Sequence, residues 1–189
     1  LIATRRCTAC HLSDAAGMPE LAMRGPDLHD AALRLERDWL AAWLADPRAL
    51  RPDARMPRTL HGSAEQRSTD VADLSAFVAS LGVGGSALPA VDGDRQAGAR
   101  HFAELGCFVC HDFDAGSGGG DERGATWVTL ARVGAKFVPG AIAAFLRDPG
   151  RHEPWTRMPD LKLSEGEAHD LEAFLRAQAT ATVPAAGPG

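Results

Sequence analysis

The sequence predicts an all-α protein made of two tandem helical domains, and three observations lead to this prediction. Residues 40–57, shifted by 102 positions, match residues 142–159 at nine of eighteen positions. Apolar residues recur at helical spacing in both copies. No segment shows the alternating pattern of a strand or the turn signals of a hairpin. The repeat therefore predicts two copies of one small helical unit.

The domain boundaries follow from composition. We expect the first domain over residues 1–81 and the second over residues 95–178. The intervening segment, GVGGSALPAVDGD, is rich in Gly and Pro, so residues 82–94 are expected to be a linker. The last residues, 179–189, have a similar composition and are expected to be a flexible tail.

A helix is predicted near the middle of each copy. The first spans Leu33 to Ala45 and is followed by Pro47, and its apolar stripe is Leu33, Leu35, Trp39, Leu40, Trp43 and Leu44. The second copy repeats this stripe with Ile142, Phe145 and Leu146, followed by Pro149.

The last helix of each copy carries an N-terminal signature. Ser63 with Gln66, and Ser164 with Glu167, fit the spacing of a capping box. The apolar positions that follow predict buried faces, and they are Val71, Leu74, Phe77, Val78 and Leu81 in the first helix and Leu171, Phe174 and Leu175 in the second.

The second copy also has an opening helix. Asp94 is the expected N-cap, and the helix leads towards Cys107. The matching helix of the first copy would begin about six residues before Leu1, as the offset between the copies requires. We therefore expect the first domain to lack its opening turns, as in a trimmed protein or a piece of a larger redox protein.

Each copy contains a C-x-x-C-H motif. The residues are Cys7, Cys10 and His11, then Cys107, Cys110 and His111. Two thiols at this spacing can bond both vinyl groups of one haem, and the adjoining His can then ligate the iron. A redox dithiol or a zinc site is the alternative, but a dithiol needs no His and zinc would require both pairs to share one metal. The motifs predict two covalently attached haem c groups.

The motifs also predict the compartment and the class of partner. Haem is attached to such motifs outside the cytoplasm, so we expect a periplasmic or otherwise extracytoplasmic protein. The sequence shows no secretory signal at Leu1 and no apolar run of the roughly twenty residues that a membrane helix needs. A formal charge of −5 argues against nucleic acid and favours redox protein partners selected by charge.

A Met follows each motif at a similar distance and in the same Arg-Met-Pro context. Met56 and Met158 are the predicted second axial ligands, because Pro restricts the preceding residue to extended geometry. Buried core filling is the usual role of Met, and it is the expected one for Met18 and Met23. His61 and His152 lie nearest the two Met loops and are the substitutes if either Met is not a ligand.

Taken together, the motifs and Met loops resemble class I cytochrome c, over nearly the whole chain as two tandem domains. In plan the chain is similar to the two-domain, two-haem cytochromes that pass electrons to terminal oxidases. The family often uses a Gly-Pro loop to support the axial His, and Gly25 and Pro26 fit this pattern in the first copy. The second copy has Val128-Thr129-Leu130 there, with a Gly-rich insertion at Gly116 to Gly120, which leaves the support of His111 open.

The resemblance implies electron transfer, and His/Met ligation argues for the same function, because it fills both axial positions and leaves no site for a substrate. We therefore expect a carrier and not an enzyme, with Arg55 and Arg157 as candidate partners of the haem propionates. The tryptophans are expected to pack on haem or core. Two alternatives stay open: an electron-transfer segment of a larger dehydrogenase or oxidase, and a di-haem enzyme such as a peroxidase. No Cys is left over for a thiolate iron ligand of the kind that thiosulfate-oxidising enzymes use.

Overall fold

The structure is a computed structural model that describes residues 26–52, 54–82, 88, 91–114, 127–152 and 156–183. The all-α prediction is confirmed in part for these residues, which are mostly helical but also contain one pair of short strands that the sequence did not predict. The helices are α1 (Leu28–Arg34), α2 (Arg37–Ala45), α3 (Pro47–Leu50), α4 (Ala64–Leu81), α5 (Arg95–Glu104), the 3-10 turn η2 (Cys107–Val109), α6 (Val133–Lys136), α7 (Ala141–Arg147), α8 (Pro149–His152) and α9 (Glu165–Gln178). Two short strands, β1 (His111–Asp112) and β2 (Val128–Thr129), pair in parallel.

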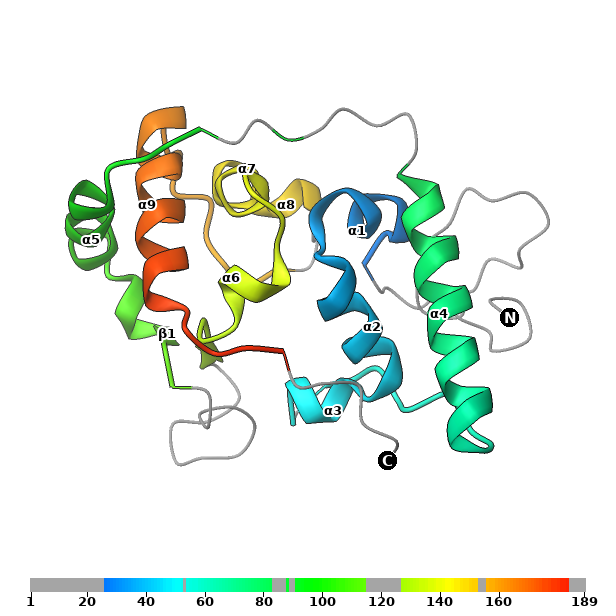
Figure 1. Cartoon of the computed structure of the whole chain (residues 1–189). Helices are drawn as coiled ribbons and strands as arrows, with labels where there is room; N and C mark the ends of the chain where they lie inside the picture. Colours follow the sequence, from blue (N-terminus) through cyan, green and yellow to red (C-terminus); the bar gives the residue numbers. More distant parts are fainter. Residues whose placement is uncertain are drawn as a thin grey trace.

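The long helix α4 packs across α1 and α2. Figure 1 shows α4 at one end of the molecule and α5 with α9 at the other. The core beneath α4 is made of aliphatic side chains, and its buried members are Leu40, Leu44, Leu60, Val71, Leu74 and Val78. Three of the five apolar positions predicted on this helix are thus buried in one cluster.

The helix α9 packs against α5, α6 and α7. Gly98 of α5 lies so close to α9 that an added Cβ atom would overlap the carbonyl oxygen of Asp170. Beside this crossing, Phe102, Phe113 and Phe174 form an aromatic cluster with ring centroids 5.3–6.0 Å apart. The small residue lets the two helix backbones approach, and the aromatic side chains fill the space next to it.

The two copies of the repeated segment fold into the same order of elements. In each copy a helix ends at an Asp that is followed by Pro and a four-residue helix, α3 or α8. Asp46 Oδ1 accepts hydrogen bonds from the amides of Arg48 and Ala49, and Asp148 Oδ1 accepts one from the amide of Arg151. The Asp-Pro pair therefore ends one helix and caps the next, with Pro in the first turn, where no amide is needed.

One predicted helix is divided in the structure. The apolar stripe predicted a single helix from Leu33 to Ala45, but α1 ends at Arg34 and α2 begins at Arg37. Between them, the amide of Glu36 donates a hydrogen bond to the carbonyl of Lys136. A contact with a segment a hundred residues away thus replaces the helical hydrogen bonds at this point.

The same contact relates the two copies of the repeat. Leu35 forms an antiparallel bridge with Phe137, which is its own equivalent under the shift of 102. The flanking hydrogen bonds, from Glu36 N to Lys136 O and from Val138 N to Arg34 O, are both 2.9 Å and exchange under that shift. Equivalent residues that pair in opposite directions are what a local two-fold axis generates.

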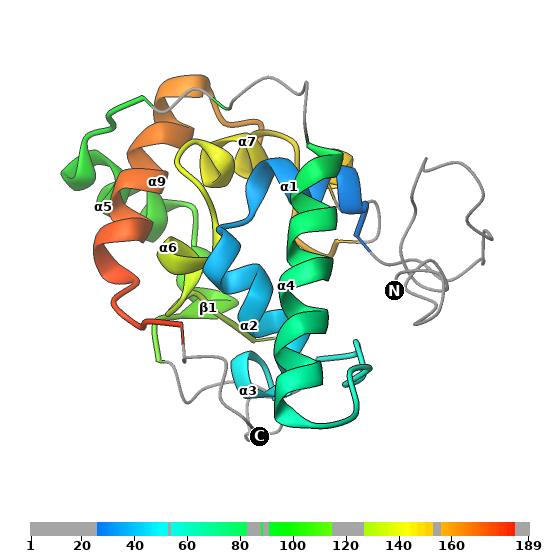
Figure 2. The ribbon, with the colours of Figure 1, turned by 45° about the vertical axis from the view of Figure 1, so that its right-hand side comes forward.

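A second pair of contacts has the same symmetry. His152 of α8 lies against Asp30 of α1, and Arg132 Nη1 donates to the carbonyl oxygen of Leu50 at 3.4 Å. Asp30 is equivalent to Arg132, and Leu50 to His152, under the shift of 102. In both views α1 and α2 lie between α4 and the group formed by α6, α7 and α9 (Figures 1 and 2).

Three predicted helix starts are confirmed. Asp94 accepts hydrogen bonds from the amides of Gln96 and Ala97, and Ser164 forms a complete capping box with Glu167. Ser63 accepts from the amide of Gln66, while the Gln66 side chain donates to Asp70. The predicted box at Ser63 is therefore formed on the Ser side, and the Gln bonds one turn further along the helix.

Several predictions fall largely outside the described ranges. These are the segment from Leu1 through Gly25, most of the 82–94 linker, the Gly-rich insertion and the end of the 179–189 tail. The division into two domains stays a prediction. Within the described ranges, no helix combines the length and the apolar character that crossing a bilayer would take.

Candidate haem site

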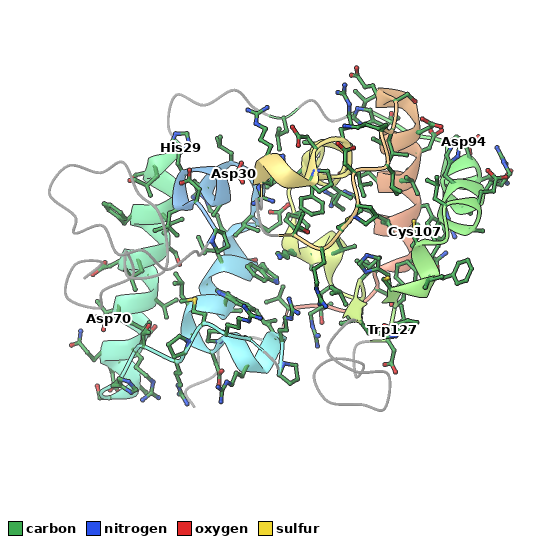
Figure 3. All side chains as sticks on the ribbon, turned by 180° about the vertical axis from the view of Figure 1, so that it is seen from behind. His29, Asp30, Asp70, Asp94, Cys107 and Trp127 are labelled. Atoms are coloured by element: carbon green, nitrogen blue, oxygen red, sulfur yellow. The ribbon has the colours of Figure 1, made fainter. Side chains whose placement is uncertain are left out.

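The second C-x-x-C-H motif follows directly after α5. Gly106 adopts the left-handed conformation with φ of 70°, which Gly reaches without strain, and turns the chain from α5 into η2. Cys107 begins η2 at the end of α5, beside α9 (Figure 3). Both Cys107 and Cys110 are free thiols, the first half-buried and the second exposed. Both sulfur atoms are therefore available to form thioethers.

The electrostatics of Cys107 differ from those of a redox dithiol. Burial raises the pKa of this thiol above its ordinary value of 9.0, and the neighbouring Cys110 raises the pKa further. Catalytic dithiols depend on a Cys whose pKa is lowered towards or below neutrality. The environment of Cys107 therefore favours a structural or covalently modified Cys over a dithiol catalyst.

His111 is held by the short parallel pairing of β1 with β2. Its Nδ1 atom lies 2.9 Å from the carbonyl oxygen of Val128. A carbonyl oxygen only accepts, so this hydrogen bond requires a proton on Nδ1. In the neutral ring Nε2 is then the unprotonated nitrogen, which is the state that an iron ligand needs.

The backbone fixes this carbonyl from both sides. The amide of Val128 donates to the carbonyl of Cys110 at 3.0 Å, and the amide of Leu130 donates to the carbonyl of Asp112 at 2.7 Å. The sequence left the support of His111 open, because no Gly-Pro pair stands in this copy. The structure supplies the carbonyl from Val128, one of the three residues aligned with that loop.

Apolar side chains from both sides of the second motif pack together. Phe102, Phe113, Leu130 and Met158 are partly buried and pack against one cluster beneath α9. The thioether of Met158 thus belongs to the same apolar cluster as the residues that flank the His111 segment. Its backbone amide donates to Thr156 Oγ1 at 3.2 Å, within the loop that precedes α9.

Two further apolar side chains lie between the cysteines. Phe108 is 54% exposed and Val109 is 62% exposed, unusual values for large apolar residues. Together with the accessible thiols, the protonated Nδ1 of His111 and the thioether of Met158, they fit a covalently attached haem. Cys107, Cys110, His111 and Met158 would hold it.

The Met of the first copy has a distinct neighbour. The indole Nε1 of Trp43, on α2, donates to the sulfur of Met56 at 3.1 Å. Met56 is partly buried and packs against the core beneath α4. The first-copy motif, Cys7, Cys10 and His11, lies outside the described residues, so its relation to Met56 stays a prediction.

The remaining predicted site residues have varied surroundings. Pro26 precedes the N-cap of α1, while Arg55 and Arg157 are exposed and stand next to their Met residues in the chain. Of the substitute ligands, His61 is exposed, and His152 is partly buried against Asp30. Among the described residues, no three His, Cys, Asp or Glu side chains gather as a metal site formed by protein alone.

Comparisons with protein-family models, with curated proteins and with solved structures gave no match to this chain. The motifs, the repeat and the geometry around them are therefore the indications of function in this chain.

Proposed function

We propose that the chain is a di-haem c-type cytochrome that transfers single electrons between protein partners. The observation that carries this proposal is the His111 geometry. The ring follows a Cys-x-x-Cys pair with free thiols and donates from Nδ1 to a fixed carbonyl, so that Nε2 is available for iron. Met56 and Met158 would supply the opposite ligands.

The chain's own residues suit outer-sphere electron transfer, in which no substrate binds to the iron. A haem bound in this way would supply a one-electron ferric/ferrous couple. His111 is oriented by Val128, and this hydrogen bond would make the imidazole a stronger donor to a bound iron. Met158 is partly buried against the apolar cluster beneath α9, and such packing would limit structural change at the site between oxidation states.

The location and the partners follow from the same chemistry. Covalent haem attachment at C-x-x-C-H motifs would occur outside the cytoplasm, so we propose the periplasm or another extracytoplasmic space. The overall charge of −5 favours basic patches on the donor and acceptor proteins, for example a dehydrogenase or a terminal oxidase.

The test is a haem count together with ligand spectroscopy on protein matured in a periplasm. We expect two haems per chain by the pyridine haemochrome method and a sulfur-to-iron charge-transfer band that resists cyanide. Replacing Cys107 and Cys110 by Ala should remove one haem, and replacing Cys7 and Cys10 should remove the other. No haem in the parent chain would refute the proposal.

The cyanide experiment also tests the closed site. Rapid cyanide binding at one of two haems would show an open iron and would favour a di-haem peroxidase over a carrier. A band that persists at full intensity supports the carrier.

A further inference from the structure

The sulfur of Met56 is engaged by an indole donor. Trp43 Nε1 donates to Met56 Sδ at 3.1 Å, within a partly buried environment. A thioether sulfur has two lone pairs and is a weak acceptor. One lone pair can accept from Trp43 while the other stays available to a metal.

The position of the indole is fixed by a second tryptophan. Trp39 stacks on Trp43 with ring centroids 5.0 Å apart and planes inclined by 16°. Trp39 is buried, with 7% of its surface exposed, and the ammonium of Lys136 lies 4.8 Å from its ring centroid. The indole of Trp43 is thus held by the ring of Trp39, which in turn contacts Lys136 of the second copy.

The second copy has no such donor at the equivalent position. Phe145 corresponds to Trp43 under the shift of 102, as Met158 corresponds to Met56. The Phe145 ring lies against His152, with centroids 6.2 Å apart, and a phenyl ring has no N–H to give. At this equivalent position, therefore, the first copy offers an indole N–H to its Met and the second copy offers a phenyl ring.

We propose that Trp43 is a positioning residue for Met56 and makes the first site the one with the higher reduction potential, an inference that rests on the proposed function. The hydrogen bond withdraws electron density from the sulfur. When the sulfur becomes a poorer donor, ferric iron loses more stabilisation than ferrous iron does. Reduction therefore becomes more favourable, and the reduction potential rises. Hydrogen bonds to a metal's ligands are an established means of tuning its potential.

The experiment is a redox titration of the full di-haem protein and of Trp43→Phe, which gives the first copy the side chain that the second already has. A Met56→His variant identifies which potential belongs to the first site. We expect Trp43→Phe to lower the potential of the first site by up to about 59 mV. For a one-electron couple this is about a tenfold change in the ferrous-to-ferric ratio at a fixed solution potential. The second potential should stay unchanged.

The matched control is Trp39→Phe, which retains an aromatic ring in the stack and leaves the donor on Trp43. It should change the first potential much less than Trp43→Phe does. An unchanged or raised first potential in Trp43→Phe, or a lower potential at the first site of the parent protein, would overturn the inference.

A measurement on the unmutated protein guards against a variant that does not fold. In the ferrous protein, the Trp43 indole proton should exchange slowly and show a nuclear Overhauser effect to the Met56 methyl group. Absence of that effect would overturn the inference. Absence of haem, or a Met56→Ala variant with an unaltered charge-transfer band, would instead refute the proposed function or its ligand assignment.

Discussion

His152 Nδ1 lies 3.0 Å from Asp30 Oδ1, and this contact joins α8 of the second copy to α1 of the first. The Nε atom of Arg34 lies 2.6 Å from the other carboxylate oxygen. Only 9% of the His152 side chain and 5% of the Arg34 side chain are exposed. One carboxylate thus pairs with the buried Arg34 and the partly buried His152 where the two copies meet.

The Asp30 contact predicts an acid-dependent loss of stability. Burial alone would raise the pKa of Asp30, but the hydrogen bonds and positive charges of His152 and Arg34 outweigh it and hold the pKa below its ordinary value of 3.8. A lowered folded-state pKa stabilises the protein above the ordinary value, and this contribution disappears as the pH falls through the folded-state value.

Asp30→Asn should therefore lower the free energy of unfolding by about 2 kcal/mol at neutral pH. The difference between variant and parent should shrink below pH 3.8, as urea denaturation at several pH values can show. The exposed Asp73 of α4 provides the control, Asp73→Asn, which should have little effect. A difference that does not depend on pH would contradict the proposed role of the charge.

A second prediction concerns the crossing of α5 and α9. Gly98→Ala places a Cβ atom 2.8 Å from Phe174 Cβ and onto the backbone of Asp170, so the helices must separate. We expect a loss of about 3 kcal/mol in unfolding free energy. An Ala in place of a helical Gly usually stabilises by up to about 1 kcal/mol, so the sign itself is informative.

Gly166→Ala is the matched control for this crossing, because Gly166 lies in α9 with nothing within 4 Å of an added Cβ. It should be neutral or stabilising. Thermal unfolding of both variants measures the contrast, and a stable Gly98→Ala protein would contradict the tight packing.

A third prediction concerns a buried carboxylate that caps a helix. Glu172 of α9 accepts hydrogen bonds from the amides of Gly140 and Ala143 at the start of α7, both at 2.9 Å. Arg176 donates to the same carboxylate at 2.8 Å. Glu172→Gln points an N–H group at amides that need an acceptor, and should cost about 2 kcal/mol.

The comparison for Glu172 is Glu165→Gln on the same helix, whose side chain is 62% exposed. Hydrogen exchange should report the loss specifically as faster exchange of the α7 amides in Glu172→Gln. Uniform changes over the whole protein would argue against a local capping role.

A fourth prediction tests the axial ligand of the second copy. Met158→Ala should remove about half of the sulfur-to-iron band, lower the potential of one haem and allow cyanide to bind there, because Met ligation raises the potential. Met23→Ala is the control and should leave the spectrum intact. An unaltered spectrum in Met158→Ala would refute the ligand assignment.

Local signals were sufficient to predict much of the helical structure. The N-caps at Asp94 and Ser164 depend on residues within three positions, and the predicted helix end before Pro47 depends on its neighbours. The break at Leu35 could not be predicted in this way. The apolar stripe continues through it, and only the pairing with Phe137 interrupts the helix.

In the candidate site, too, local sequence signals predicted some residues, while contacts between distant segments could not be predicted. The motif made Cys107, Cys110 and His111 the candidates, because covalent haem attachment would require this spacing. The carbonyl of Val128 is a backbone group, so no residue type in the sequence identifies it. Its position was still suggested by the repeat, because Val128 is equivalent to Pro26 under the shift of 102. The hydrogen bond from Trp43 to Met56 depends on the turn between α2 and the Met loop, and nothing in the sequence distinguishes that indole from a core tryptophan.

The antiparallel bridge of Leu35 with Phe137 also bears on the history of the chain. A contact that a residue makes with its own equivalent is one that two separate identical chains can make without a linker. Duplication and fusion of a self-associating ancestor would preserve it, since its hydrogen bonds come from the backbone and tolerate substitution. A single chain that carries both copies can also hold different residues at the equivalent positions 43 and 145, Trp43 and Phe145, which a homodimer of identical chains cannot do.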